Sequence, residues 1–147
     1  MSGSQPNAYL RDAVMTASPE QLQLMLFDGA IRFATQGREA VVAKNHELAF
    51  EKLSRAQKIV LEMERGLRPE IAPDLCARMA ALYLFVYRKL VDGCVDRSPA
   101  AIDEALEILR FERETWRMLM DKIASETAEA HPHPAASVSE GGLSVEG

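Results

Sequence analysis

The sequence predicts an all-α fold: an antiparallel up-down bundle of four main helices, preceded by an N-terminal capping arm. Two observations support this. Apolar residues recur at three- and four-residue intervals through four long segments, and short runs of capping or turn-forming residues separate those segments. Because short connections join antiparallel neighbours, an up-down topology is favoured. We expect the arm over 1–17, the bundle over 18–125 and a disordered tail over 126–147.

The first bundle helix has unusually explicit start signals. Ser18 can cap it, Pro19 fits the first helical position, and Gln21 completes a Ser-x-x-Gln capping box. Its predicted extent is about 19–43. At about 100° per residue, one apolar face gathers several residues. They are Leu22, Met25, Leu26, Gly29, Ala30, Phe33 and Gly37.

Three further apolar residues, Leu24, Phe27 and Ile31, fall roughly opposite that face. A surface helix needs an apolar stripe of only about 100°, so an arc twice as wide indicates contacts on two sides. Two interpretations remain open. The helix is either packed centrally in the core, or it also forms the floor of a groove for a partner.

Asn45 can cap the second helix, which Gly66 ends. Its stripe is Ala49, Leu53, Ala56, Val60 and Met63. The third helix is predicted over about 71–93, with Leu75, Met79, Leu82, Tyr83, Val86 and Leu90 as its main stripe. Leu84, Phe85, Tyr87 and Val91 widen that stripe, which suggests a central position.

Ser98 and Pro99 start the fourth helix as Ser18 and Pro19 start the first. Its inward residues are Ile102, Ala105, Leu106, Leu109, Trp116, Met120 and Ile123. Phe111 and Met118 lie roughly opposite them and so point away from the bundle centre. Exposed apolar residues are common, but a pair in helical register can seat an incoming helix.

Composition limits the classes of function. The chain has 147 residues, enough for one domain, and a net charge of −5 argues against nucleic-acid binding. We expect no direct membrane insertion, because no apolar run approaches about 18 residues. Cys76 and Cys94 should lie on one helix about 27 Å apart, so they are expected to be free thiols. The expected location is the cytosol.

We expect neither catalysis nor a cofactor. His46 falls in a turn, and His131 and His133 fall in the predicted tail, so no histidine is placed in the bundle core. The sequence holds no Glu-x-x-His pair, no Gly-rich phosphate loop and no nucleophile turn. The cysteine and histidine spacings match no zinc site, so no metal is expected.

Three segments together resemble the flagellar secretion chaperone (FliS) family. They are NAYL at 7–10, TASPEQLQLMLFDGAIRF at 16–33 and LYLFVYRKL at 82–90, and the resemblance covers about residues 7–124. The chain departs from the family's usual residues at Phe27, Leu84, Phe85 and Cys94. The family holds flagellin in the cytosol before export.

The resemblance implies a cytosolic export chaperone and not an enzyme. Its client would be the C-terminal segment of flagellin, and its docking partner the cytoplasmic domain of FlhA, the membrane protein of the flagellar type III export gate. A monomer or weak homodimer is expected. The alternative is a generic helical adaptor or a homo-oligomeric bundle that uses the same apolar surface on itself.

The predicted client-binding residues are the apolar positions that the core does not require. The arm contributes an amphipathic patch of Asn7, Tyr9 and Leu10, placed to dock beside the widest apolar helix. We expect it to cover the client groove when no client is bound. The full predicted set is Tyr9, Leu10, Leu24, Phe27, Ile31, Leu84, Tyr87, Phe111 and Met118.

Overall fold

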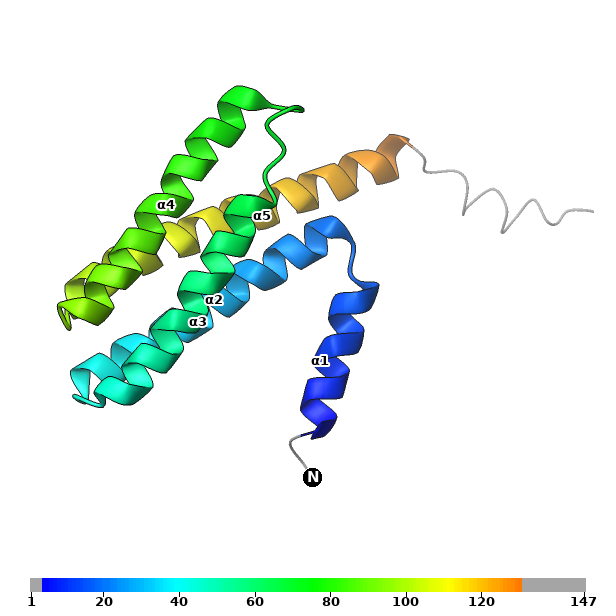
Figure 1. Cartoon of the computed structure of the whole chain (residues 1–147). Coiled ribbons are helices and arrows are strands. Elements are labelled where there is room, and N and C mark those ends of the chain that lie inside the picture. Colours follow the sequence, from blue (N-terminus) through cyan, green and yellow to red (C-terminus); the bar gives the residue numbers. More distant parts are fainter. Residues whose placement is uncertain (1–3, 131–147) are drawn as a thin grey trace, which may run out of the picture. The chain divides into compact units, whose positions relative to one another are not determined.

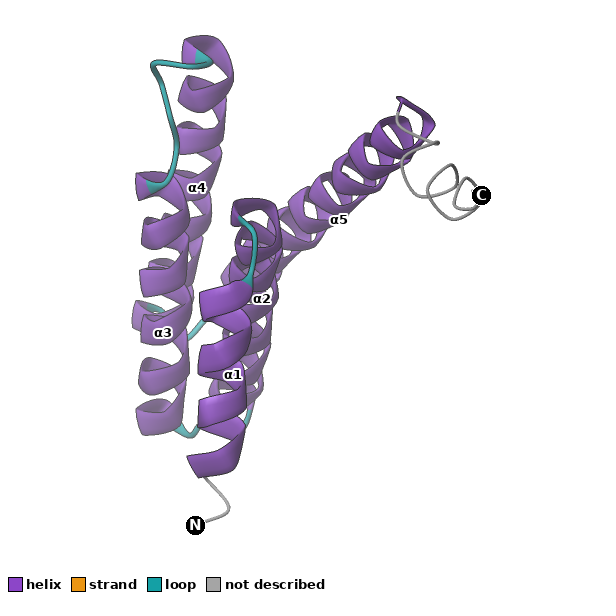
Figure 2. Ribbon diagram, turned by 90° about the vertical axis from the view of Figure 1, so that its right-hand side faces the viewer, coloured by secondary structure: helices purple, strands orange, loops and turns teal. Residues whose placement is uncertain are grey.

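The computed structural model describes residues 4–130, with side chains from Ala8 onward. This part of the chain is entirely helix and short connections (Figures 1 and 2). Its helices are α1 (Ser4–Thr16), α2 (Pro19–Val42), α3 (His46–Arg65), α4 (Pro73–Val95) and α5 (Pro99–Ala130). The all-α prediction is confirmed.

The chain divides into two compact units after Glu114. The first holds α1 to α4 and the start of α5, and the second begins at Thr115 within α5. In the first unit, α3 packs against both α2 and α4 (Figure 1). Side chains of α5 contact α2 through Arg38 and Asp103, and contact α4 through Lys89 and Glu104. The four helices therefore form a closed ring in the order α2, α3, α4, α5.

The α2 start follows the sequence signals. The Ser18 Oγ accepts a hydrogen bond from the Gln21 backbone N–H at 3.1 Å, and the Ser18 N–H donates to the Gln21 Oε1 at 3.0 Å. Both halves of the predicted capping box are present. All five residues of the predicted α3 stripe are also buried: Ala49, Leu53, Ala56, Val60 and Met63. These local expectations are confirmed.

The predicted faces of α2 are partly wrong. Phe27 was expected opposite the core face, but only 2% of its surface is exposed. The buried line of the helix runs through Phe27, Ala30, Ala34, Gly37 and Val41. The close approach to α3 explains this: a Cβ built on Gly37 would lie 2.5 Å from the Leu53 Cδ2. Because the small residues of α2 allow this close approach, a prediction based only on the large apolar residues assigns the buried face of α2 incorrectly.

The boundaries at both ends also differ from expectation. The segment expected only as a capping arm, over 1–17, contains helix α1 at Ser4–Thr16. Its run of alanine, leucine, arginine and methionine favours helix, and Ser18 and Pro19 begin a new one. At the other end, α5 continues to Ala130, so 126–130 is helical instead of disordered. Glutamate and alanine support helix there. The rest of the predicted tail lies outside the described residues.

The turn that joins α2 to α3 and the turn that joins α4 to α5 have similar backbone geometry. Each contains a cationic residue with positive φ, 61° at Lys44 and 52° at Arg97. In each, a backbone N–H reaches back five residues, from Asn45 to the Ala40 carbonyl at 2.8 Å and from Ser98 to the Gly93 carbonyl at 3.0 Å. The left-handed conformation costs a side-chain-bearing residue about 1–2 kcal/mol.

Replacing Lys44 or Arg97 with glycine should therefore stabilise the protein by about 0.5–1 kcal/mol, after glycine's greater freedom in the unfolded chain is subtracted. Urea unfolding measures the change. Asp96→Gly is the control, because Asp96 lies in the same turn with φ −92° and should lose stability. Destabilisation by the Lys44 or Arg97 substitution would show that the side chain itself holds the turn.

Candidate functional site

The structure places the predicted client-binding residues at different depths. Phe27 is buried and cannot meet a client in this conformation. Leu24, Ile31 and Tyr87 are half-buried. The exposed members are Tyr9, Leu10, Leu84, Phe111 and Met118. Met118 belongs to the second unit, and the others to the first.

The predicted cap over the groove is not formed by these residues. Tyr9 is 77% exposed and Leu10 is 51% exposed, so neither side chain is docked in an apolar groove. Val14 and Met15, further along α1, are also exposed. Helix α1 therefore presents apolar side chains outward instead of covering those of α2.

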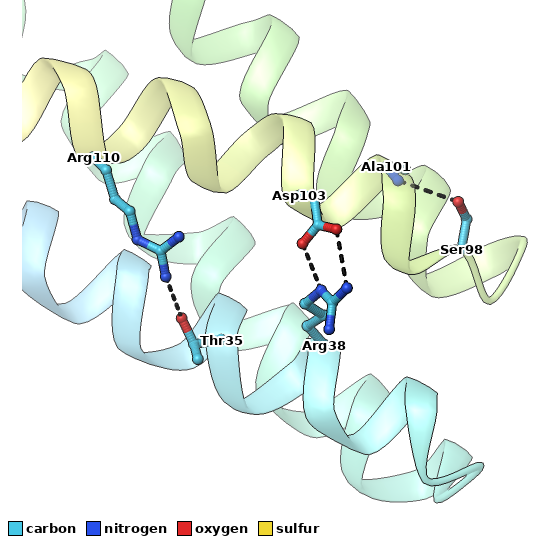
Figure 3. A network of polar contacts seen from close by, with 6 residues as sticks. All are labelled: Thr35, Arg38, Ser98, Ala101, Asp103 and Arg110. Carbon is cyan, nitrogen blue, oxygen red and sulfur yellow. Dashed lines mark hydrogen bonds and ion pairs between the residues drawn. The ribbon is translucent and has the colours of Figure 1, made fainter.

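Leu24 and Ile31 lie on the α5 side of α2, where a line of polar contacts closes the seam between the two helices. The Arg38 guanidinium binds both Asp103 carboxylate oxygens at 2.5 and 3.0 Å, and an Arg110 N–H donates to the Thr35 Oγ1 at 3.4 Å (Figure 3). Arg113 binds Asp28 further along. The Arg38 hydrogen bond holds the pKa of the Asp103 carboxyl below its usual value.

Leu84 and Tyr87 lie on the α3 side of α4. A hollow of about 350 Å³ opens beside the α3–α4 connection and is lined on α4 by Cys76, Ala77 and Ala80. Leu84 and Tyr87 follow Ala80 by four and seven residues, so they continue the same face of α4. Leu84 remains 39% exposed there.

The predicted residues therefore do not gather in one groove. In the ring of helices, the seam between α2 and α5 lies across the bundle from the seam between α3 and α4. Phe111 is separate from both: it is 67% exposed and faces away from the buried α5 residues Ile102, Ala105, Leu106 and Leu109. A partner that touched all three places would have to be extended and wrap around the bundle.

A polar group inside the first unit joins three helices. The Gln23 amide on α2 donates to the Tyr83 hydroxyl on α4 at 3.2 Å, and the Phe27 and Tyr83 rings pack at 6.5 Å between centroids. Burial raises the pKa of the Tyr83 phenol to about 12, assisted by the Glu112 charge from α5. Burial also raises the pKa of Glu112. Tyr83 thus stays protonated and acts as a hydrogen-bonding core residue.

Two exposed aromatic residues were missed as site candidates. Phe50 on α3 is 65% exposed, and Phe85 on α4 is 39% exposed, with the Lys89 ammonium 5.4 Å from its ring centroid. The sequence pattern of α3 could have identified Phe50 as a candidate site residue. It is a large apolar residue outside the predicted α3 stripe, as Phe111 is outside that of α5.

The described residues offer no metal site: no three histidine, cysteine, aspartate or glutamate side chains are grouped to hold an ion. Cys76 and Cys94 are free thiols, and burial raises the pKa of Cys94. None of the helices within 4–130 combines the length and apolar character that crossing a membrane requires. Together, the four packed helices and the apolar side chains dispersed over their surface define the class of small all-helical bundles.

The sequence is similar to those of flagellar secretion chaperones. The family model described as "Flagellar protein FliS" matches residues 2–123. The flagellar secretion chaperone FliS of Bacillus subtilis is 31% identical over 124 residues, covering 84% of this chain and 90% of that protein. The Salmonella typhimurium protein of that name is 30% identical over 114 residues, covering 77% and 84%.

A crystal structure of a bacterial flagellar chaperone shares the fold, with a TM-score of 0.67 at 20% identity. The match covers 80% of this chain and 98% of that one. The chain belongs to the FliS family of flagellar secretion chaperones. Its relatives are named as chaperones of flagellar export and not as enzymes.

Proposed function

We propose that this protein is a cytosolic export chaperone that binds the C-terminal segment of flagellin and keeps it from polymerising before secretion. The observation that supports this most directly is the distribution of unpartnered apolar side chains. Leu84 and Phe111 are exposed on different helices, and Leu24 and Ile31 are partly exposed on a third. A flexible segment that folds as it binds can reach them all, whereas a rigid globular partner cannot.

The energetics favour a long, wrapped client. Ordering a disordered segment costs about 2–5 kcal/mol of binding free energy. The interface must therefore be extended, burying on the order of 1,000–3,000 Å², for binding to remain favourable. Such a segment binds with low affinity per unit area and can therefore be released. Covering amphipathic client helices also hides the apolar surface through which they would associate with one another.

Delivery is the second part of the proposal. The loaded chaperone would dock on the cytoplasmic domain of FlhA at the flagellar type III export gate, and the chaperone itself would be a monomer or weak homodimer. A generic adaptor or self-associating bundle would instead bury the same residues against its own copies. Stoichiometry separates the two, since the chaperone should take one client chain per molecule.

Co-purification with flagellin from the same cell tests the proposal. Full-length flagellin should form a one-to-one complex by light scattering. Flagellin that lacks about 40 C-terminal residues, a length whose folding would bury the required area, should not. Amide exchange should show that segment becoming protected on binding. If the protein instead forms a stable oligomer with itself and binds neither flagellin, the proposal is overturned in favour of a self-associating bundle.

A further inference from the structure

Three cationic side chains converge on the Phe33 ring, at the outer edge of the seam between α2 and α3. The Arg32 guanidinium carbon lies 5.1 Å from the ring centroid, the Lys52 Nζ 5.5 Å and the Arg55 guanidinium carbon 5.4 Å. Arg32 comes from α2, and Lys52 and Arg55 come from α3. We call this group the Phe33 cluster.

The charges of the Phe33 cluster are poorly balanced within the protein. Among the residues that the structure describes, neither Arg32 nor Lys52 forms an ion pair. Arg55 has a carboxylate partner in Glu51, at 3.6 Å, and both of those side chains are more than half exposed. An exposed pair of that kind contributes little. The cluster therefore keeps most of its positive charge available.

Packing alone does not require this arrangement. A cation–π contact near the protein surface contributes only about 0.5–1 kcal/mol, while three like charges around one ring repel each other. The close α2–α3 contact is made elsewhere along the seam, where Gly37 lies against the Leu53 side chain. The cluster concentrates three positive charges in a chain whose net charge is −5. Concentrated positive charge around a half-buried aromatic ring is complementary to carboxylates beside an apolar side chain.

The Phe33 cluster lies apart from the proposed flagellin-binding residues of α2. Leu24 and Phe33 are nine residues apart, which places them about 180° apart around the helix. Leu24 is on the side that faces α5, and Phe33 is on the side that faces α3. A ligand at the cluster would therefore occupy a second surface.

We propose that the Phe33 cluster is a docking site for an acidic peptide segment of a partner protein. Its carboxylates would bind Arg32, Lys52 and Arg55, and an apolar side chain between them would cover the exposed part of the Phe33 ring. A peptide fits better than a nucleic acid, because a phosphate backbone needs a track of cations and the rest of this chain is acidic. The site does not depend on flagellin binding.

A direct test uses a fluorescein-labelled peptide in which glutamate pairs alternate with leucine, and a matched peptide with glutamine for glutamate. Anisotropy should show saturable binding of the glutamate peptide to the full-length protein, at least tenfold tighter than the glutamine peptide. Salt should weaken the binding, because it screens exposed charges. Amide chemical shifts should change around Phe33 and not around Phe111.

Two triple variants with equal change in net charge locate the site. Arg32→Gln, Lys52→Gln and Arg55→Gln together should weaken binding of the glutamate peptide at least tenfold. The control replaces Lys44, Arg78 and Arg88 with glutamine; these cations are exposed elsewhere on the bundle, and binding should change less than twofold. Circular dichroism melts check that both variants fold.

Several outcomes would overturn the proposal. They are equal binding of the two peptides, equal losses in the two triple variants, or tighter binding of a labelled oligouridine, which would make the site a nucleic-acid surface. A concentration-dependent dimer that the cluster variant abolishes would mean that a second copy of this chain occupies the site. A cluster variant that unfolds would assign the cations to folding, and that result would also count against docking.

Discussion

Replacing Phe27 with alanine is expected to destabilise the bundle by about 3–5 kcal/mol, because the substitution removes a buried ring and leaves a cavity. Phe27 is among the largest fully buried side chains, and its ring packs against that of Tyr83 between α2 and α4. Since single domains have only about 5–15 kcal/mol of stability, the variant should be near its unfolding threshold. Urea unfolding followed by circular dichroism measures the loss.

Phe50→Ala is the matched control. Phe50 is the same residue type on a neighbouring helix but is mostly exposed, so its loss should change stability by no more than about 0.5 kcal/mol. A loss below about 1 kcal/mol for Phe27→Ala would contradict the buried assignment, since Phe→Ala in a core costs several times more. It would restore the sequence-based prediction that Phe27 faces an open groove.

Replacing Phe111 with aspartate should weaken flagellin binding by at least about 30-fold, or about 2 kcal/mol, while the bundle keeps its stability. Phe111 is exposed on the outward face of α5, so a carboxylate there meets water in the free protein. In the complex, the same carboxylate would be buried against apolar client residues, which is unfavourable. Calorimetric titration with a C-terminal flagellin peptide gives the affinity.

Phe50→Asp provides the control, because it introduces the same change at an equally exposed aromatic outside the predicted client-binding set. Its affinity should stay within about threefold of the wild type, less than 1 kcal/mol. Phe111→Leu should recover most of the binding that Phe111→Asp loses. Equal losses at Phe50 and Phe111 would show that the client contact does not single out the α5 face.

Local signals in the sequence were sufficient for the four bundle helices, but not for helix α1 or for the end of α5. Ser18, Pro19 and Gln21 fixed the start of α2, and the repeat from Ala49 to Met63 identified the buried stripe of α3. These features depend on contacts within a turn or two of helix, so neighbouring residues specify them. The family resemblance was also readable, because it rests on local residue patterns.

The tertiary structure decided which side of α2 is buried. Apolar periodicity assigned Phe27 to an outer face, but the approach of α3 over Gly37 and the Tyr83 ring on α4 place it in the core. Gathering Arg32, Lys52 and Arg55 around Phe33 likewise requires α2 and α3 to lie side by side.

The spread of the candidate site has the same origin. Leu24 and Leu84 were both predicted to contact the client, yet they lie at seams on opposite sides of the ring. Helical periodicity reports the angle of a residue around its own axis, and nothing about how neighbouring helices are rotated relative to one another. Packing of small against large side chains fixes that rotation. The sequence by itself thus determined the four bundle helices and the family, and helix packing determined which of their residues a partner can reach.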